Sequence, residues 1–185
     1  MIRWHKDKKL RREIVSWAIT IALAISLPWA TTTYAFQATR IEQLSMFPTI
    51  HDGDIVFLSK LSYLGANPKR GDIIIFEPPY KSDKALIKRV IGLPGEWMSF
   101  ENGQILINGK IFVENNDHTK TDYGQIFPKV QMPQGTRLGD DEYYVTGDNR
   151  DVSYDSRAFG PIKRNEIIGK ALCTLWPVNH IGLVK

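Results

Sequence analysis

The stretch "FENGQILINGKIFVE", residues 100–114, decides the fold class. Two Asn-Gly pairs, Asn102-Gly103 and Asn108-Gly109, flank the short apolar run "QILI". Because Asn-Gly accepts the positive φ angles of a two-residue turn, each pair predicts a hairpin between antiparallel strands. We therefore expect β-structure to dominate this part of the chain.

Short apolar runs bounded by turn residues continue on both sides of this stretch. They contrast with residues 115–135, "NNDHTKTDYGQIFPKVQMPQG", which show little periodicity and predict a loop or irregular extension. No convincing amphipathic helix interrupts the runs, so residues 37–185 are predicted to form one mainly β domain. The runs are "DIVFLS", "DIIIF", "ALIKRVIG", "EYYVTG" and "IIGKALCTLW".

The N-terminus has a different character. No charged residue occurs between Glu13 and Arg40, and Ile14–Ala35 is mostly apolar. As a helix this span is roughly 33 Å long, enough for a bilayer core of about 30 Å. We expect residues 14–36 to be a single transmembrane anchor. The uncharged run is longer than the apolar region of a cleaved signal peptide. The sequence at its C-terminal end resembles an Ala-X-Ala cleavage site only weakly. A retained anchor is therefore favoured over a removed signal peptide.

The charge distribution indicates how this anchor is oriented. Residues 1–13 hold six Lys/Arg against two acidic residues, whereas the rest of the chain is balanced at 18 and 18. A basic tail before the span predicts a cytoplasmic N-terminus, with residues 37–185 outside the membrane. The balanced remainder offers no basic face of the kind that binds nucleic acid. We expect contact with the lipid bilayer and none with nucleic acid.

Metal and disulfide chemistry find little support in the sequence. Cys173 is the single cysteine, so an internal disulfide and a cysteine-based zinc site are both excluded. The histidines are scattered and show no His-Glu-X-X-His spacing. His51 looks like a turn residue, and we expect no cofactor.

Two segments carry candidate chemistry. Ser45 lies in "LSMFPTI", a few residues beyond the apolar span, and a serine needs a base before it can act as a nucleophile. Lys88 lies within the apolar run "ALIKRVIG". A free lysine is neutral in only about one molecule in 2,500 at pH 7, but burial can lower its pKa by several units. Either Lys88 is such a base, or it simply faces solvent from a strand; Arg89 cannot serve, because guanidinium keeps its proton.

A third segment is "GDNRDVSYDSRAFGPI", residues 147–162. It places several acidic and basic side chains among Ser153 and Ser156. By itself the segment is explained equally well as part of a functional site and as a polar loop with surface ion pairs. Such ion pairs contribute little stability.

Taken together, the three segments resemble the type I signal peptidases. "SMFPT" is similar to the nucleophile box of that family, "KRVIGLPG" to its lysine box, and "GDNRDVSYDSR" to its C-terminal active-site box, in the same order and behind the same kind of anchor. The resemblance implies a mainly antiparallel β-sheet catalytic domain outside the plasma membrane. It also implies a serine endopeptidase that removes signal peptides from exported preproteins, cutting after small residues at −3 and −1 without a cofactor.

The same resemblance assigns roles to individual residues. Ser45 is the nucleophile that forms an acyl-enzyme, and Lys88 is the general base. Ser153 is expected to hydrogen-bond and orient the Lys88 amine. Asp155 and Arg157 are expected to form an ion pair supporting that wall of the site, while Met46 and Pro48 shape the nucleophile turn.

The sequence departs from the family at two positions. Gln43 stands where a hydroxyl-bearing residue often supplies the second donor of the oxyanion hole, and Val152 stands where asparagine is common. Gln43 also carries amide donors, so it is either a longer-stemmed replacement donor or a linker residue facing solvent. Both interpretations stay open.

Other functional classes remain as alternatives. A self-cleaving repressor with a Ser-Lys dyad needs a DNA-binding module, whereas residues 1–40 hold an uncharged span. A catalytically silent membrane-anchored scaffold would not need an intact Ser45 and Lys88. Both alternatives are less favoured than the peptidase.

Overall fold

The computed structural model describes residues 3–82, 84–101, 104–112 and 135–184, and the chain divides into two units at Gln37/Ala38. The predicted Asn102-Gly103 turn and most of the predicted loop at 115–135 lie outside the described residues.

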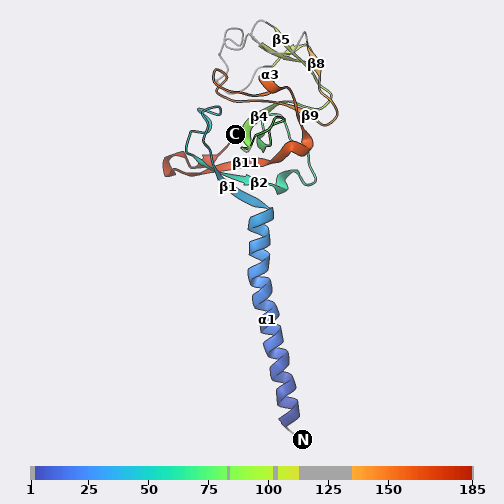
Figure 1. The fold of residues 1–185 in the computed structure, drawn as a ribbon, viewed down its shortest axis with the longest axis vertical. Coiled ribbons are helices and arrows are strands. Elements are labelled where there is room, and N and C mark those ends of the chain that lie inside the picture. The colour runs from blue at the N-terminus through green and yellow to red at the C-terminus, as the bar shows by residue number, and fades with distance from the viewer. Residues whose placement is uncertain (1–2, 83, 102–103, 113–134, 185) are drawn as a thin grey trace. The chain divides into compact units, whose positions relative to one another are not determined.

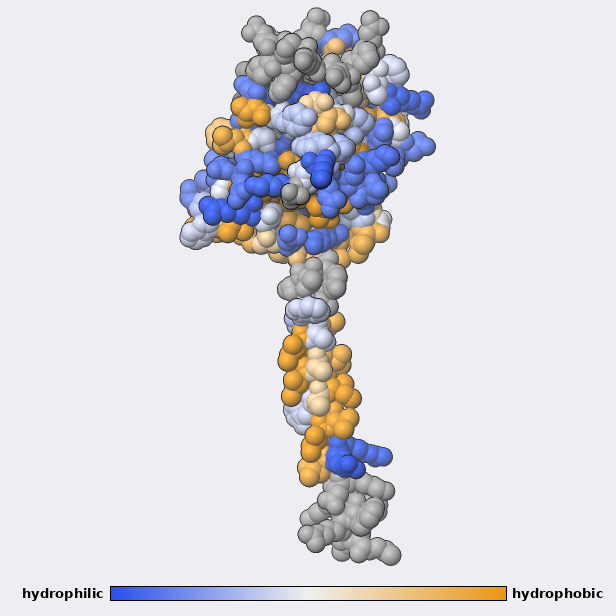
Figure 2. All heavy atoms as spheres, in the orientation of Figure 1, coloured by the Kyte–Doolittle hydropathy of each residue, from blue (hydrophilic) through white to orange (hydrophobic). Residues whose placement is uncertain are grey.

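The N-terminal unit contains one long helix, α1 (Arg3–Tyr34). From Leu10 to Trp29 its large apolar side chains are exposed, and Figure 2 shows them as the apolar surface of this helix. Within the described part of the chain, no helix has the combined length and apolarity of a membrane-crossing segment.

The second unit is built from strands, as expected from the short apolar runs. The strands of its larger sheet are β1 (Phe36–Arg40), β2 (Ile55–Ser59), β3 (Ile73–Phe76), β4 (Leu86–Gly92), β9 (Glu142–Thr146), β10 (Ile162–Lys163), β11 (Ile167–Trp176) and β12 (Gly182–Leu183). Their order is β1-β2-β11-β3-β4-β9-β10, with β12 also paired to β11. Each strand pair whose register is known is antiparallel, which confirms the predicted mainly β class.

A smaller sheet is formed by β5 (Trp97–Glu101), β6 (Gln104–Ile107), β7 (Lys110–Ile111) and β8 (Thr136–Arg137), in the order β7-β6-β5-β8. The turn from β6 to β7 has Asn108 at φ 52° and Gly109 at φ 75°, as the Asn-Gly pair predicts. Figure 1 shows this sheet at the far end of the unit from β2. Short helical turns complete the described elements: η1 (Leu61–Tyr63), α3 (Ser156–Phe159), η2 (Arg164–Glu166) and η3 (Val178–His180).

Three apolar clusters hold the sheets together. The first packs Met46 and Ile50 against β2, β3, β4 and β11. The second fills the space around β3, β4 and β9, and the third joins the end of β4 to the small sheet through Ile91, Met98 and Tyr144. β4 contributes to all three clusters, so its side chains are held rigidly.

Candidate active site

Ser45 lies on a turn that the core fixes in place. Its neighbour Met46 and the nearby Ile50 are fully buried, and the Ile50 N–H donates to the Met46 carbonyl at 2.9 Å. The Phe47–Pro48 peptide bond within the turn is cis. Ser45 itself is buried yet lines a pocket, so the turn presents its hydroxyl at the pocket wall.

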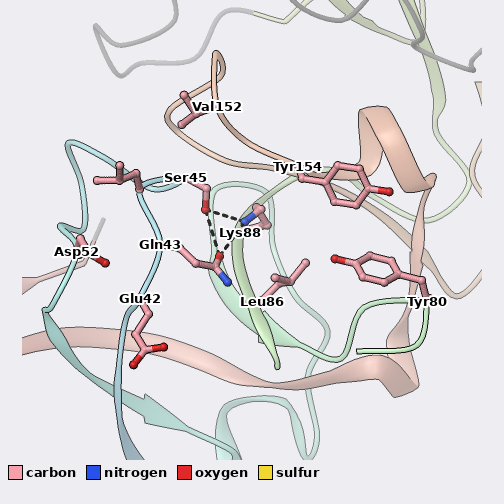
Figure 3. A pocket seen from close by; sticks show the side chains of 10 residues that line it. Glu42, Gln43, Ser45, Asp52, Tyr80, Leu86, Lys88, Val152 and Tyr154 are labelled. Carbon is pink, nitrogen blue, oxygen red and sulfur yellow. Dashed lines mark hydrogen bonds between the residues drawn. The ribbon is translucent and has the colours of Figure 1, made fainter. Parts of the chain in front are cut away.

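Strand β4 places Lys88 opposite this serine. Lys88 pairs with Ile74 of β3 in the sheet and is only 1% exposed, so it does not face solvent from its strand. A hydrogen bond of 2.7 Å joins Lys88 Nζ to Ser45 Oγ (Figure 3). The two residues are 43 positions apart in the sequence, and the fold brings them into direct contact.

The surroundings of Lys88 favour a neutral amine. Burial lowers its pKa from 10.5 to about 8, and Arg157 adds to this decrease while Asp155 and Asp148 oppose it. At pH 7 a pKa near 8 leaves about one amine in ten neutral, against roughly one in 2,500 for a free lysine. The buried position therefore supplies a usable base without any other titrating partner.

The hydrogen bonds around Nζ also suit a base. A neutral amine has two N–H groups and one lone pair. The Ile87 carbonyl lies at 3.0 Å and Gln43 Oε1 at 3.5 Å, and these two oxygens accept from the N–H groups. The lone pair is then left for the proton of the Ser45 hydroxyl.

Gln43 lies at the dyad rather than in a solvent-facing linker. Its Oε1 is 3.4 Å from Ser45 Oγ and 3.5 Å from Lys88 Nζ (Figure 3). The amide therefore turns its acceptor, and not its N–H donors, towards the two reactive atoms. In this arrangement the Gln43 amide would have to rotate before its N–H groups could donate to an oxyanion.

Ser153 does not make the expected hydrogen bond to Lys88. Its side chain is 1% exposed, and its Oγ has no hydrogen-bond partner among the described residues. The Lys88 amine instead contacts three other oxygens, those of Ser45, Gln43 and Ile87. Ser153 nevertheless lies close to Ser45, because a side chain on Gly147 would clash with both Ser153 Oγ and the Ser45 carbonyl.

Asp155 and Arg157 form the expected ion pair. Arg157 Nε donates to Asp155 Oδ1 and Arg157 Nη2 to Asp155 Oδ2, both at 2.8 Å, and both side chains are buried. Arg157 Nη2 also donates to the carbonyls of Arg150 and Ser153, while Asp155 accepts from the Gly147 N–H at 3.0 Å. The pair thus holds the whole 147–157 segment in one conformation.

This segment also holds the nucleophile turn directly. The Asn149 N–H donates to the Ser45 carbonyl at 3.0 Å, and its side-chain amide donates to the Leu44 carbonyl at 3.2 Å. Gly147 permits this close approach because it lacks a side chain.

Asp148 is a connecting residue that sequence reasoning missed. Its carboxylate accepts two hydrogen bonds from Arg89, which follows Lys88, and one from Thr49 on the nucleophile turn. All three candidate segments therefore meet at Asp148. The Gly-Asp-Asn-Arg pattern marked this region, but local sequence gave no signal for its partners.

The dyad opens onto a pocket of about 590 Å³, a size typical of ligand sites. Beside Ser45, Lys88 and Gln43, its lining residues are Glu42, Leu44, Asp52, Tyr80, Leu86, Val152 and Tyr154. Val152 is 59% exposed at this pocket, and Tyr80 and Tyr154 meet edge to face with ring centroids 5.7 Å apart. The pocket thus has room for a ligand beside the Ser45 hydroxyl and the Lys88 amine.

The chain is similar to known proteins of one family. The family model described as signal peptidase, peptidase S26, matches residues 13–176. A signal peptidase I from Leptolyngbya laminosa is 39% identical over 170 residues, covering 88% of this chain and 80% of the relative. A signal peptidase IB from Staphylococcus aureus (strain COL) is 32% identical over 183 residues, covering 92% of this chain and 94% of the relative. A crystal structure of a signal peptidase I from Enterococcus faecalis V583 is 30% identical, with a TM-score of 0.44 over 57% of this chain and 97% of that one.

Proposed function

Since the chain belongs to the signal peptidase family of peptidase S26, and is thus a serine endopeptidase, we propose that Ser45 and Lys88 are its catalytic dyad. The observation that carries the proposal is the 2.7 Å contact between Ser45 Oγ and the buried Lys88 Nζ. A hydroxyl and an amine at hydrogen-bond distance form the nucleophile–base pair that acyl transfer needs.

The reaction proceeds in two halves. Ser45 Oγ attacks the scissile carbonyl carbon while its proton passes to Lys88 Nζ. The C–N bond then breaks, Lys88 returns the proton to the leaving amine, and the new N-terminus departs. Lys88, neutral again, takes a proton from a water molecule whose oxygen attacks the acyl-enzyme ester. The C–O bond to Ser45 then breaks, the signal peptide leaves as a carboxylic acid, and Lys88 returns the proton to Ser45 Oγ.

Gln43 and the 147–157 segment support the dyad in this proposal. The backbone N–H of Ser45 is the first oxyanion donor, and the Gln43 amide, once rotated, is the second. Ser153 lies buried beside the Ser45 turn, and the Asp155–Arg157 ion pair keeps the 147–157 segment rigid.

The substrates are exported preproteins with small residues at −3 and −1. Support comes from the family and from the apolar side chains of Leu44, Leu86 and Val152 beside the dyad, which suit short apolar side chains. No metal or organic cofactor takes part in this scheme.

The catalytic unit acts next to a membrane. We assign residues 1–13 to a cytoplasmic tail, 14–36 to a single-pass anchor in the plasma membrane, and 37–185 to the extracytoplasmic catalytic domain. The uncharged run between Glu13 and Arg40 and the exposed apolar side chains of α1 support this arrangement.

The test is cleavage of a purified preprotein with an Ala-X-Ala site by the detergent-solubilised full chain. Wild type should release the signal peptide in trans at that site, and Ser45→Ala should release none. Cleavage by Ser45→Ala at the wild-type rate would remove Ser45 as the nucleophile.

A further inference from the structure

Two histidines that are distant in the sequence meet around one buried carboxylate. His180, in η3 near the C-terminus, has Nδ1 2.8 Å from Asp54 Oδ1. His51, between the nucleophile turn and β2, has Nδ1 3.8 Å from Asp54 Oδ2. One ligand atom from each residue lies within 4.8 Å of the other two. The fold therefore assembles two imidazoles and a carboxylate that appear unrelated in the sequence.

Asp54 is held firmly at the centre of this cluster. The residue is 1% exposed, and its Oδ2 accepts the backbone N–H of His51 at 2.9 Å. Its own backbone carbonyl accepts the N–H of Ile41 at 2.8 Å. A carboxylate positioned in this way keeps its oxygens in place whether or not the histidines move.

The two imidazoles remain accessible from solvent. The side chains of His51 and His180 are 38% and 28% exposed, and their rings stack with centroids 4.2 Å apart and an angle of 22°. An ion can therefore reach the cluster, and the rings have room to change their relative angle.

We propose that His51, Asp54 and His180 form a binding site for a borderline divalent transition-metal ion such as Zn²⁺. Two imidazoles and a carboxylate are ligands that Zn²⁺, Co²⁺, Ni²⁺ and Cu²⁺ prefer, whereas Mg²⁺ and Ca²⁺ prefer oxygen ligands only. The three groups carry one negative charge when the histidines are neutral, which partly offsets the charge of the ion. Water occupies the remaining coordination position.

The ligand atoms lie near enough for small side-chain movements to bring them onto one ion. With metal–ligand bonds of about 2.0–2.1 Å, tetrahedral ligand atoms lie about 3.4 Å apart. The His180 Nδ1 is 2.8 Å from Asp54 Oδ1 and the His51 Nδ1 is 3.8 Å from the other oxygen, Oδ2, while one ligand atom from each residue lies within 4.8 Å of the others. Each imidazole must also point its nitrogen at the ion within its ring plane, so binding opens the stacked pair by rotating one ring.

The site is separate from the dyad but connected to the turn that carries Ser45. Neither histidine nor Asp54 lines the pocket of the candidate active site. The ring of Phe47, two residues after Ser45, meets the ring of His51 edge to face at 5.2 Å. A bound ion therefore cross-links the C-terminal segment to the base of the nucleophile turn, and it should raise the melting temperature.

The experiment is a titration of the untagged, detergent-solubilised full chain with Zn²⁺ in competition with a chromophoric chelator, followed by Co²⁺ absorption. We expect one ion per chain with a dissociation constant below about 10 µM. The His51→Gln/His180→Gln variant should lose at least about tenfold in affinity together with the tetrahedral Co²⁺ bands. The matched control is His5→Gln/His118→Gln, which removes the same number of histidines and should bind as wild type does.

Two further measurements test whether Zn²⁺ binds at another group or at a site that does not distinguish between metal ions. Cys173→Ser should keep the affinity, and Mg²⁺ should not compete. Equal Zn²⁺ affinity in the two double-histidine variants would overturn the proposal, as would a wild type that binds no ion in this range. Since Ser45 and Lys88 are intact in every variant, loss of the ion is distinguishable from failure of the proposed peptidase chemistry.

Discussion

Arg89 and Asp148 form a buried ion pair with two parallel hydrogen bonds, Nε to Oδ1 at 2.8 Å and Nη2 to Oδ2 at 2.7 Å. Arg89 also donates to the Gly71 carbonyl at 2.9 Å, and Asp148 accepts from Thr49. Arg89 cannot act as the base, but it supports the site through these contacts. A lysine cannot reproduce the planar two-pronged contact with Asp148.

We therefore predict that Arg89→Lys destabilises the catalytic domain by about 2 kcal/mol or more, because it leaves a buried carboxylate oxygen without its charged donor. Denaturant unfolding measures this change. Arg137→Lys is the matched control, since Arg137 is exposed on β8 and should show almost no change. Equal unfolding free energies for the two variants would show that the Asp148 contact contributes little.

The lowered pKa of Lys88 predicts a specific pH dependence. Because the amine acts in its neutral form, kcat/KM should rise about tenfold per pH unit at low pH and level off above the pKa of about 8. The measurement is kcat/KM for preprotein cleavage across the pH range in which the fold is intact. A rate that does not change between pH 6 and pH 8 would contradict a lysine base with this pKa.

Gln43 should affect both the rate and its pH dependence. Gln43→Ala is expected to lower kcat by roughly 10²–10³ with little change in KM, the usual effect of removing one oxyanion donor. Gln43→Glu should be at least as damaging. Gln43→Glu should also shift the rise of kcat/KM to higher pH, because a carboxylate beside Lys88 stabilises the charged amine and raises its pKa.

Two further variants complete this test. Gln43→Ser should recover part of the rate by restoring a hydroxyl donor. Gln104→Ala, the same substitution at an exposed position of β6, should leave kcat unchanged. Wild-type kcat in both Gln43→Ala and Gln43→Glu would leave the second oxyanion donor unassigned.

The proposed topology predicts a defined pattern of protection. External protease added to spheroplasts should reach residues 37–185, whereas a tag on the basic tail should stay protected until the membrane is opened. The readout is immunodetection of the tail tag before and after detergent. A tag that is digested in intact spheroplasts would reverse the proposed orientation.

Local patterns predicted most of the strands, because alternation and turn residues act over a few positions. The β6–β7 turn at Asn108-Gly109 and the ten-residue strand β11 both form where the sequence indicated. Sheet order was not predictable in the same way. β11 lies between β2 and β3, and such long-range pairing depends on packing that no short pattern encodes.

The candidate site was predictable to a similar extent. Ser45 and Lys88 were candidates because of their residue types and local context, and the resemblance of the three segments to one family assigned their roles. The orientation of the Gln43 amide depends on three-dimensional contacts instead, and so does the Ser153 hydroxyl, which has no hydrogen-bond partner among the residues that the structure describes. The meeting of His51 and His180 was equally hidden, because 129 positions separate them in the sequence.

The central claim is that Lys88 is the base for Ser45, and Lys88→Arg tests it most directly. Arginine keeps the positive charge but cannot lose its proton, so it cannot accept the proton of Ser45. The measurement is single-turnover cleavage of an Ala-X-Ala preprotein, with Lys84→Arg as the exposed-lysine control and circular dichroism to verify folding. We predict cleavage no faster than in Ser45→Ala for Lys88→Arg and a wild-type rate for Lys84→Arg. A folded Lys88→Arg that cleaves at the wild-type rate would contradict the claim.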